Sequence, residues 1–237
     1  MFLGHFAAAM AAKKVARKAS LGTLVLSAQF ADCLWPVLLL LGFEQVRIVP
    51  GITRVAPLDF LSDPISHSLL MQLVWGLLLG GAYLRLRHDS YTATVVGALL
   101  PTHWLLDYFA HRPDMPLYPG GPKVGLGIWN SLPLTLAVEF GVFVGGGVIL
   151  YLSATRLKGG WNFGFWSFVP FLAVMYPVSL FGPPPPDVRI LALSAPGALA
   201  EDGVGRPAAR CEDGKSRVMI RRRVRNRSAV PGAERQR

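Results

Sequence analysis

The stretch "HSLLMQLVWGLLLGGAYLRL", residues 67–86, decides the fold class of this chain. From His67 to Leu84 no Asp, Glu, Lys or Arg interrupts it. An α-helix rises 1.5 Å per residue, so about 20 apolar residues are needed to cross the hydrocarbon core of a bilayer. The stretch therefore predicts a transmembrane helix.

Four further stretches have similar length and apolarity, and they are bounded by charges, Gly/Pro clusters or aromatic residues: 20–43, 91–110, 130–154 and 161–182. Over all 237 residues, 52% are hydrophobic and 16% are charged. A soluble domain has about 25% charged residues, so a soluble enzyme is excluded. The prediction is an all-α, polytopic membrane bundle of about five transmembrane helices, formed by residues 1–182.

The first dozen residues, "MFLGHFAAAMAA", are too short to cross a bilayer and predict a half-helix. They would lie in the membrane interface, or enter the bilayer and bring His5 beside the first span. Residues 183–237 begin with Pro and continue rich in Arg, Ala and Gly, which predicts a disordered tail. An alternative is that this tail is not the bundle's native ending and replaces a sixth span.

The net charge of +10 is concentrated in the tail. Residues 1–182 hold 12 Lys/Arg and 8 Asp/Glu, giving +4, whereas residues 183–237 hold 12 and 6, giving +6. The charge therefore predicts no nucleic-acid partner for the membrane body, whose partner is the lipid bilayer. Eight basic residues flank one side of the predicted spans, at 13–18, 85–87 and 156–158, and four flank the other. The positive-inside rule puts the amino-terminal cluster in the cytoplasm, in a multi-pass inner-membrane protein.

The end of the third predicted span, "PTHWLLDYFAHR", carries the strongest chemical signal. His103, Asp107 and His111 recur every four residues, so on a helix they share one face. Imidazole nitrogens and carboxylate oxygens are ligands for zinc and similar divalent ions. A structural His–Asp hydrogen bond is the alternative. An ionisable group inside a span is costly, by about 2.5–3.5 kcal/mol, which favours a functional role.

Other ionisable residues in or beside the apolar stretches complete the pattern. Asp32 lies in the first span, four residues before Pro36, whose ring is expected to kink the helix there. His67 opens the second span, where the alternative is a polar helix start capped by Ser66. Glu139 lies in the fourth span. By contrast, His88 lies among charged residues and is interpreted as an ordinary solvated side chain.

Together these residues predict a buried divalent-metal site, with zinc expected and manganese as an alternative. The predicted ligands are His5, Asp32, His67, His103, Asp107 and His111. An ion held there would lower the pKa of a bound water toward ~7 and generate hydroxide for attack on an ester or phosphoester. Glu139 or Asp32, whichever is not a ligand, would accept the proton.

The early "GH", the Asp of the next helix, "SHSLL" and "HWLLD" together resemble the family of LexA-binding, inner membrane-associated hydrolases. The resemblance covers roughly residues 1–155. It implies a membrane-bound, metal-dependent hydrolase in which His5, Asp32, His67, His103 and Asp107 occupy the metal-site positions. The order of the ligands is also similar to that of zinc-dependent phospholipase C enzymes, an analogy that implies no shared fold.

Two alternatives use the same residues. A transporter would relay protons or bind a carried ion through buried acids and histidines near the bilayer midplane, often between internal repeats. A non-catalytic membrane scaffold would retain the site without using it. No internal repeat is visible in the sequence, and the predicted ligands favour one side of the membrane, so we favour the hydrolase.

Overall fold

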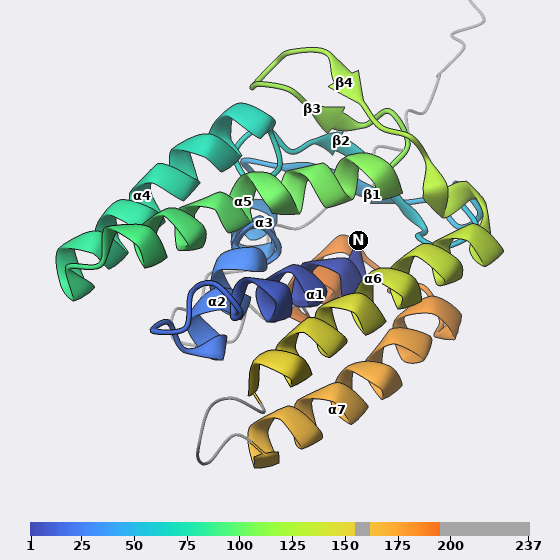
Figure 1. Ribbon diagram of the computed structural model, residues 1–237. Helices are drawn as coiled ribbons and strands as arrows, with labels where there is room; N and C mark the ends of the chain where they lie inside the picture. The colour runs from blue at the N-terminus through green and yellow to red at the C-terminus, as the bar shows by residue number, and fades with distance from the viewer. Residues whose placement is uncertain (155–161, 195–237) are drawn as a thin grey trace, which may run out of the picture. The chain divides into compact units, whose positions relative to one another are not determined.

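The computed structural model describes residues 1–154 and 162–194 of this chain (Figure 1). These residues form eight α-helices, one short 3-10 helix and four short strands. In chain order the elements are α1 (Phe2–Ala12), α2 (Leu21–Ala28), α3 (Phe30–Leu40), β1 (Gln45–Ile48), β2 (Leu58–Ser62), α4 (Leu69–Arg87), α5 (Ser90–Ala110), β3 (Met115–Pro116), β4 (Lys123–Val124), η1 (Ile128–Asn130), α6 (Leu132–Ala154), α7 (Asn162–Phe181) and α8 (Val188–Ser194).

Each of the five predicted apolar stretches is helical, but five membrane spans are not confirmed. Within the described residues, Leu69–Arg87 and Leu132–Leu152 are long and apolar enough to cross a membrane, with mean hydropathies of 1.5 and 1.8. The α2–α3 pair becomes a third candidate if the two helices count as one bent span. α5 is 21 residues long, but its polar residues, which include His103 and Asp107, lower its hydropathy. In α7, the stretch Phe168–Phe181 is apolar but shorter than a span.

The first predicted span is broken at Gln29, where the axes of α2 and α3 differ by 51°. Gln29 leaves the helical conformation, with φ −101° and ψ 8°. This break lies seven residues before Pro36, where the sequence predicted a kink, and Pro36 itself lies inside α3. The break places Asp32 in the first turn of α3, next to the end of α2.

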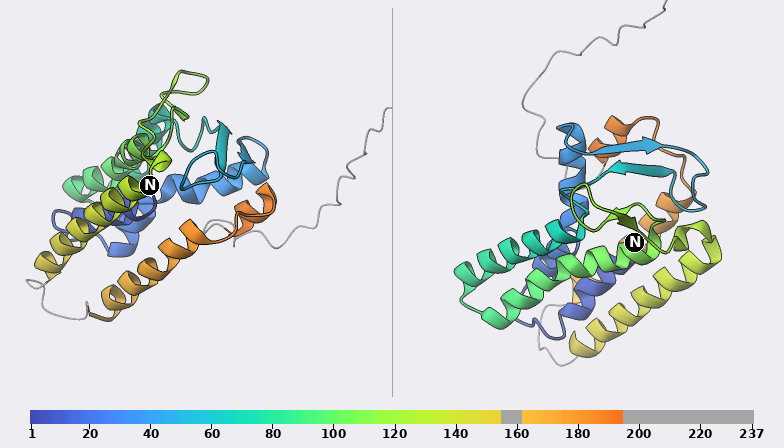
Figure 2. Two further views of the ribbon diagram at one scale, coloured as in Figure 1. Left: turned by 90° about the vertical axis from the view of Figure 1, so that its right-hand side faces the viewer. Right: turned by 90° about the horizontal axis from the view of Figure 1, so that it is seen from above.

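Helix α1 is buried among other helices instead of lying on a surface. It packs against α2, α5, α6 and α7, and the described elements surround it in the views of Figures 1 and 2. Small residues allow this: a Cβ added to Gly146 of α6 would lie 2.6 Å from the carbonyl oxygen of Ala7. Gly146 therefore permits the close packing of α1 against α6.

α4 and α5 form an antiparallel pair that also depends on glycine (Figure 1). A Cβ on Gly76 would lie 2.5 Å from the carbonyl oxygen of Gly97, and a Cβ on Gly97 would lie 2.7 Å from that of Gly76. Such separations are shorter than any van der Waals contact, so these two backbones touch directly.

The connections between helices hold strands that the all-α prediction missed. β1 and β2 pair antiparallel, with Val46 opposite Phe60, and β3 pairs with β4. Both ribbons lie at the end of the bundle where α5 finishes and α4 begins (Figure 2). Phe60 and Val46 pack on Trp35 of α3, and this cluster fixes the first ribbon over that end.

Part of the predicted tail is ordered helix. α8 packs against α3 and β1, and its Ala192 is fully buried. The sequence prediction underestimated this segment because Val188–Ser194 makes only about two helical turns and is separated by one residue from four prolines. Residues 195–237, which make up the rest of the predicted tail, lie outside the described residues.

Candidate metal centre

The carboxylate of Asp107 is the centre of the site. It lies with His103 on the buried face of α5, as the four-residue spacing predicts, and Nε2 of His103 is 3.0 Å from Oδ2 of Asp107. α5 ends at Ala110, so His111 is extended (φ −70°, ψ 149°) and does not continue the helical stripe as expected. Its Nε2 nevertheless lies 4.0 Å from Oδ1 of Asp107.

His5 reaches the same carboxylate from α1. Its Nε2 is 3.1 Å from Oδ1 of Asp107, and its ring stacks on His103 with centroids 3.7 Å apart. The amine of Met1 donates to the same Asp107 oxygen and lies 3.1 Å from Nε2 of His5. The burial of α1 therefore brings His5 next to Asp107 and His103.

His67 and Asp32 face the other oxygen of Asp107. Nε2 of His67 is 3.4 Å from Oδ1 of Asp32 and 4.0 Å from Oδ2 of Asp107, while Nε2 of His103 is 3.9 Å from Asp32. Asp32 is the most exposed of these side chains, at 42%, and it lines the cavity described below. The other five predicted ligands thus gather around the carboxylate of Asp107, although they come from α1, α3, the segment just before α4 and the end of α5.

The Nδ1 atoms of three histidines are already occupied by other partners. Nδ1 of His103 lies 2.7 Å from the carbonyl oxygen of Ala28, which can only accept, so this nitrogen carries the proton. Nδ1 of His111 is 3.0 Å from the Asp114 carboxylate, which likewise accepts. Both imidazoles therefore direct Nε2 toward Asp107, as a metal-ligating histidine does when its second nitrogen is held by an outer partner.

The same assignment holds for His67, through Ser66. The hydroxyl of Ser66 lies 2.6 Å from Oε2 of Glu44 and 2.7 Å from Nδ1 of His67. A hydroxyl has a single proton, and Ser66 donates it to the carboxylate, so the hydroxyl accepts from Nδ1–H of His67. Glu44 also accepts the backbone N–H groups of Ile65 and Ser66. Ser66 is therefore a partner of His67, and the helix cap expected there is provided by Ser68 instead.

Two overlapping groups of three side chains lie close enough together to hold an ion. Around an ion with ligands at 2.0–2.2 Å, the ligand atoms are separated by roughly 3.3–3.6 Å. The four nitrogen–oxygen distances among His67, His103, Asp32 and Asp107 span 3.0–4.0 Å. Two triads meet the requirement that all ligand atoms lie within 4.8 Å of one another: His5, His103 and Asp107, and Asp32, His67 and His103.

The surroundings of Nε2 of His103 favour a cation at this position. It lies 3.0 Å from Oδ2 of Asp107, yet the geometry makes no hydrogen bond, and this nitrogen has no hydrogen-bond partner in the described part of the chain. A buried lone pair facing a carboxylate is unfavourable unless a positive group lies between them. For His67, burial lowers the pKa, but the hydrogen bond to Asp32 and the nearby Asp107 and Asp63 outweigh this and raise it to about 9. A proton is therefore an alternative cation at His67.

Glu139 has a structural role that the sequence did not indicate. Its two oxygens accept the backbone N–H groups of Phe2, at 3.2 Å, and Leu3, at 2.6 Å. These are unpaired donors at the start of α1, where a carboxylate also interacts favourably with the helix dipole. Glu139 therefore fixes the position of the helix that carries His5, and it also lines the cavity.

Sequence reasoning missed three supporting acids: Glu44, Asp63 and Asp114. Asp114 lies three residues after His111, so its proximity could have been noticed. Glu44 has no local signal, because its partner Ser66 is 22 residues away. Asp63 is buried, its two oxygens have no hydrogen-bond partner among the described residues, and burial raises its pKa to about 6.

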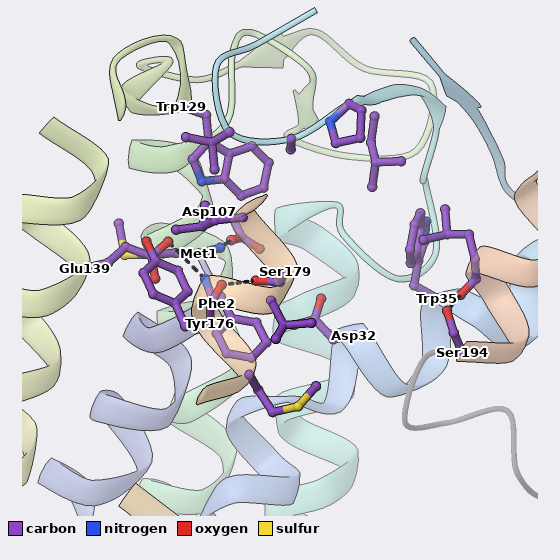
Figure 3. Close-up of a pocket in the computed structure, with 18 of the residues that line it drawn as sticks. Met1, Phe2, Asp32, Trp35, Asp107, Trp129, Glu139, Tyr176, Ser179 and Ser194 are labelled. Atoms are coloured by element: carbon purple, nitrogen blue, oxygen red, sulfur yellow. Dashed lines mark hydrogen bonds and ion pairs between the residues drawn. The ribbon is translucent and has the colours of Figure 1, made fainter. Parts of the chain in front are cut away.

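A cavity of about 580 Å³ borders the site. Asp32, His67, Asp107 and His111 contribute to its wall, as does Glu139. Figure 3 shows Asp107, Met1 and Glu139 together at one end of the view, and Trp35 and Ser194 at the other. Four of the six predicted ligands are thus accessible to a molecule bound in the cavity.

Comparison with known proteins gives no relative. No family model matches this chain, and neither a curated protein nor a solved structure is significantly similar to it.

Proposed function

We propose that this chain is a membrane-bound, metal-dependent hydrolase that acts on an ester or phosphoester. The observation that carries the proposal is the orientation of three imidazoles. His67, His103 and His111 each have Nδ1 held by an outer partner, and each directs Nε2 toward Asp107. Ion pairing alone does not require outer partners for all three, whereas metal ligation commonly uses them.

The ligands of the proposed ion are Asp107 and three histidines around it, His5, His67 and His103. A divalent ion bound there would supply a water of lowered pKa, near ~7, and polarise the substrate oxygen. Zinc suits imidazoles with a carboxylate, and manganese is the alternative. Asp107 is nine-tenths or more buried and fixes the imidazoles, whereas Asp32 is 42% exposed to the cavity and can exchange a proton with a bound molecule. Glu139 has both oxygens paired with backbone amides, which leaves Asp32 as the better proton acceptor.

The exposed faces of α4 and α6 support a location in the inner membrane. Both helices are candidate spans, and large apolar side chains on them are exposed, among them Leu77 at 78% and Val144 at 59%. An apolar surface of this kind is stable against lipid and not against water. The site lies near the start of α4 and the end of α5, whereas Arg85 and Arg87 lie at the opposite end of α4. With the basic end cytoplasmic, the site would face the outer side.

Metal content decides between the hydrolase and the other candidates. The detergent-purified chain is measured by plasma mass spectrometry after reconstitution with zinc or manganese, next to the double variant His103→Ala/Asp107→Ala. His88→Asn is the matched control, because His88 is an exposed histidine with φ 53°, a conformation that Asn tolerates. We expect one or two equivalents in wild type and the control, and loss in the double variant. Absence of stoichiometric metal in folded wild type would contradict the proposal and favour a proton-relaying transporter or a scaffold.

A further inference from the structure

The cavity beside the candidate metal centre is polar at the end next to that centre and apolar elsewhere. Apart from the site residues, its polar lining residues are Gln29, Ser179 and Ser194, together with the hydroxyl of Tyr176 and the indole N–H groups of Trp35 and Trp129. The last three lie next to site residues, beside Glu139, His67 and His111 respectively. The two serine hydroxyls donate within their own helices, to the carbonyl oxygens of Tyr176 and Leu191. The remaining lining residues are aliphatic, aromatic or proline. A ligand would therefore find its polar partners at the Asp32–His67 end.

The lining also lacks the side chains that bind highly charged molecules. Among the described residues, no Lys or Arg lines the cavity, and the amine of Met1, which does line it, is paired with Asp107. Nucleotides and other polyanions are usually held by such groups, often with two donors per phosphate oxygen pair. The cavity consequently suits a molecule with one small polar group and a large apolar part.

The apolar wall lies along α7, which borders the exterior. Phe171, Met175 and Val178 line the cavity and are themselves 57%, 38% and 57% exposed. Leu172 and Tyr176, on the next face of the helix, are buried against Leu3 of α1. A hydrocarbon chain lying along α7 would thus be covered by protein on one side and lie close to the lipid-facing surface on the other.

From this arrangement we infer that the substrate is an amphiphile: an ester or phosphoester joined to a hydrocarbon chain. The polar group lies at Asp32 and His67, and the chain lies against Met175 and Phe171 of α7. The inference rests on the proposed function for the reaction, but the binding of the chain can be measured without turnover.

Crosslinking locates the chain directly. Full-length protein in nanodiscs is irradiated with hexadecyl phosphate that carries a diazirine near the end of its chain, and the adducts are mapped by mass spectrometry. We expect adducts on 171–180, reduced by excess unlabelled hexadecyl phosphate and not by inorganic phosphate. Met175→Trp fills the cavity and should lower the yield at least fivefold. Val174→Trp is the control, since Val174 is 64% exposed and outside the lining.

A chain-length series separates this inference from the proposed reaction. With metal-loaded protein and 4-nitrophenyl esters of increasing acyl length, kcat/KM should rise by up to about fourfold per added methylene until the cavity is full. Equal hydrolysis of acetyl and octanoyl esters would overturn the amphiphile while leaving the hydrolase intact. Adducts at the expected positions without hydrolysis of any 4-nitrophenyl ester or phosphoester would overturn the hydrolase and leave the chain site. Adducts spread evenly over α4 and α6, unchanged by Met175→Trp, would overturn the chain site.

Discussion

The imidazole of His5 lies flat against that of His103, with ring centroids 3.7 Å apart and ring planes 10° from parallel. Both side chains are about 1% exposed, and both direct Nε2 to Asp107, His5 to Oδ1 and His103 to Oδ2. Two stacked imidazoles cannot both be protonated at low cost when they are this close and this buried. At most one of the two rings is therefore charged. A neutral His103 directs a lone pair toward Asp107, because its Nδ1–H donates to Ala28, whereas Nε2 of His5 lies within hydrogen-bond distance of both Asp107 and the Met1 amine.

Replacing His5 with Phe separates the contribution of ring packing from the contribution of the Nε2 ligand. His5→Phe keeps an aromatic ring against His103 but removes Nε2, so we expect a folded protein whose zinc affinity is lowered at least tenfold. Isothermal titration with zinc measures the affinity, and the thermal unfolding midpoint tests the fold. An unchanged zinc affinity in His5→Phe would exclude His5 as a ligand. His88→Asn should leave both quantities unchanged.

The Glu44–Ser66–His67 chain should tune the site without touching the ion. Ser66→Ala removes the hydroxyl that accepts from Nδ1–H of His67 and that donates to Glu44. Loss of an outer partner typically lowers metal affinity 10–100-fold, and we expect that range here. Metal titration of Ser66→Ala against Ser90→Ala, an exposed serine at the start of α5, checks it. Equal affinity in both variants would mean that His67 does not bind the ion.

An ion-pair chain fixes His111 and the first ribbon. Arg47 and Arg112 both donate to Asp59, and Arg112 also pairs with Asp114, the partner of His111. The hydrogen bond from Arg47, together with the charges of both guanidinium groups, holds the pKa of Asp59 below its usual range. A lowered pKa in the folded state stabilises it fully above the ordinary value of about 3.9, and this contribution is lost as the pH falls through the lowered value.

Asp59→Asn should therefore destabilise the protein in a pH-dependent way. At pH 7 we expect the free energy of unfolding to fall by about 1–2 kcal/mol, since the pairs are partly screened by solvent. The difference from wild type should shrink as the pH falls below 4. Thermal unfolding in detergent at several pH values measures this, with Arg54→Gln, an exposed arginine between β1 and β2, as the control. A difference that is constant from pH 7 to pH 3 would show that the charge of Asp59 does not matter.

The sequence predicted the helices and the cluster of buried histidines and acids more completely than the contacts that support them. Long apolar runs specify helices, and ionisable residues within them stand out because lipid and protein interiors penalise charge. The contacts that join the parts are distant in sequence: Glu139 binds the amide of Leu3, 136 residues away. The β1–β2 ribbon did have a local signal, because Val46 and Ile48, and later Leu58 and Phe60, alternate with polar residues around a Pro/Gly segment. That alternation was masked by the dominant helical pattern.

Gly146 offers a test of whether the position of α1 determines the site. A methyl group there would lie 2.6 Å from the carbonyl oxygen of Ala7, while Gly145 and Gly147 have no described atom within 4 Å of theirs. Gly146→Ala must push α1 away from α6, which typically costs about 1–3 kcal/mol, less the 0.5–1 kcal/mol that Ala gains over Gly in a helix.

Because α1 carries His5, the shift should also weaken metal binding. Gly145→Ala and Gly147→Ala add the same methyl group within the same turn, so they should keep wild-type zinc affinity and unfold at the same or a slightly higher temperature. Zinc titration and thermal unfolding of the three variants give both quantities. If Gly146→Ala unfolds earlier but binds zinc as wild type does, α1 supports the fold and His5 is not required for the ion. If all three variants behave alike, the close contact between Gly146 and Ala7 does not contribute to stability.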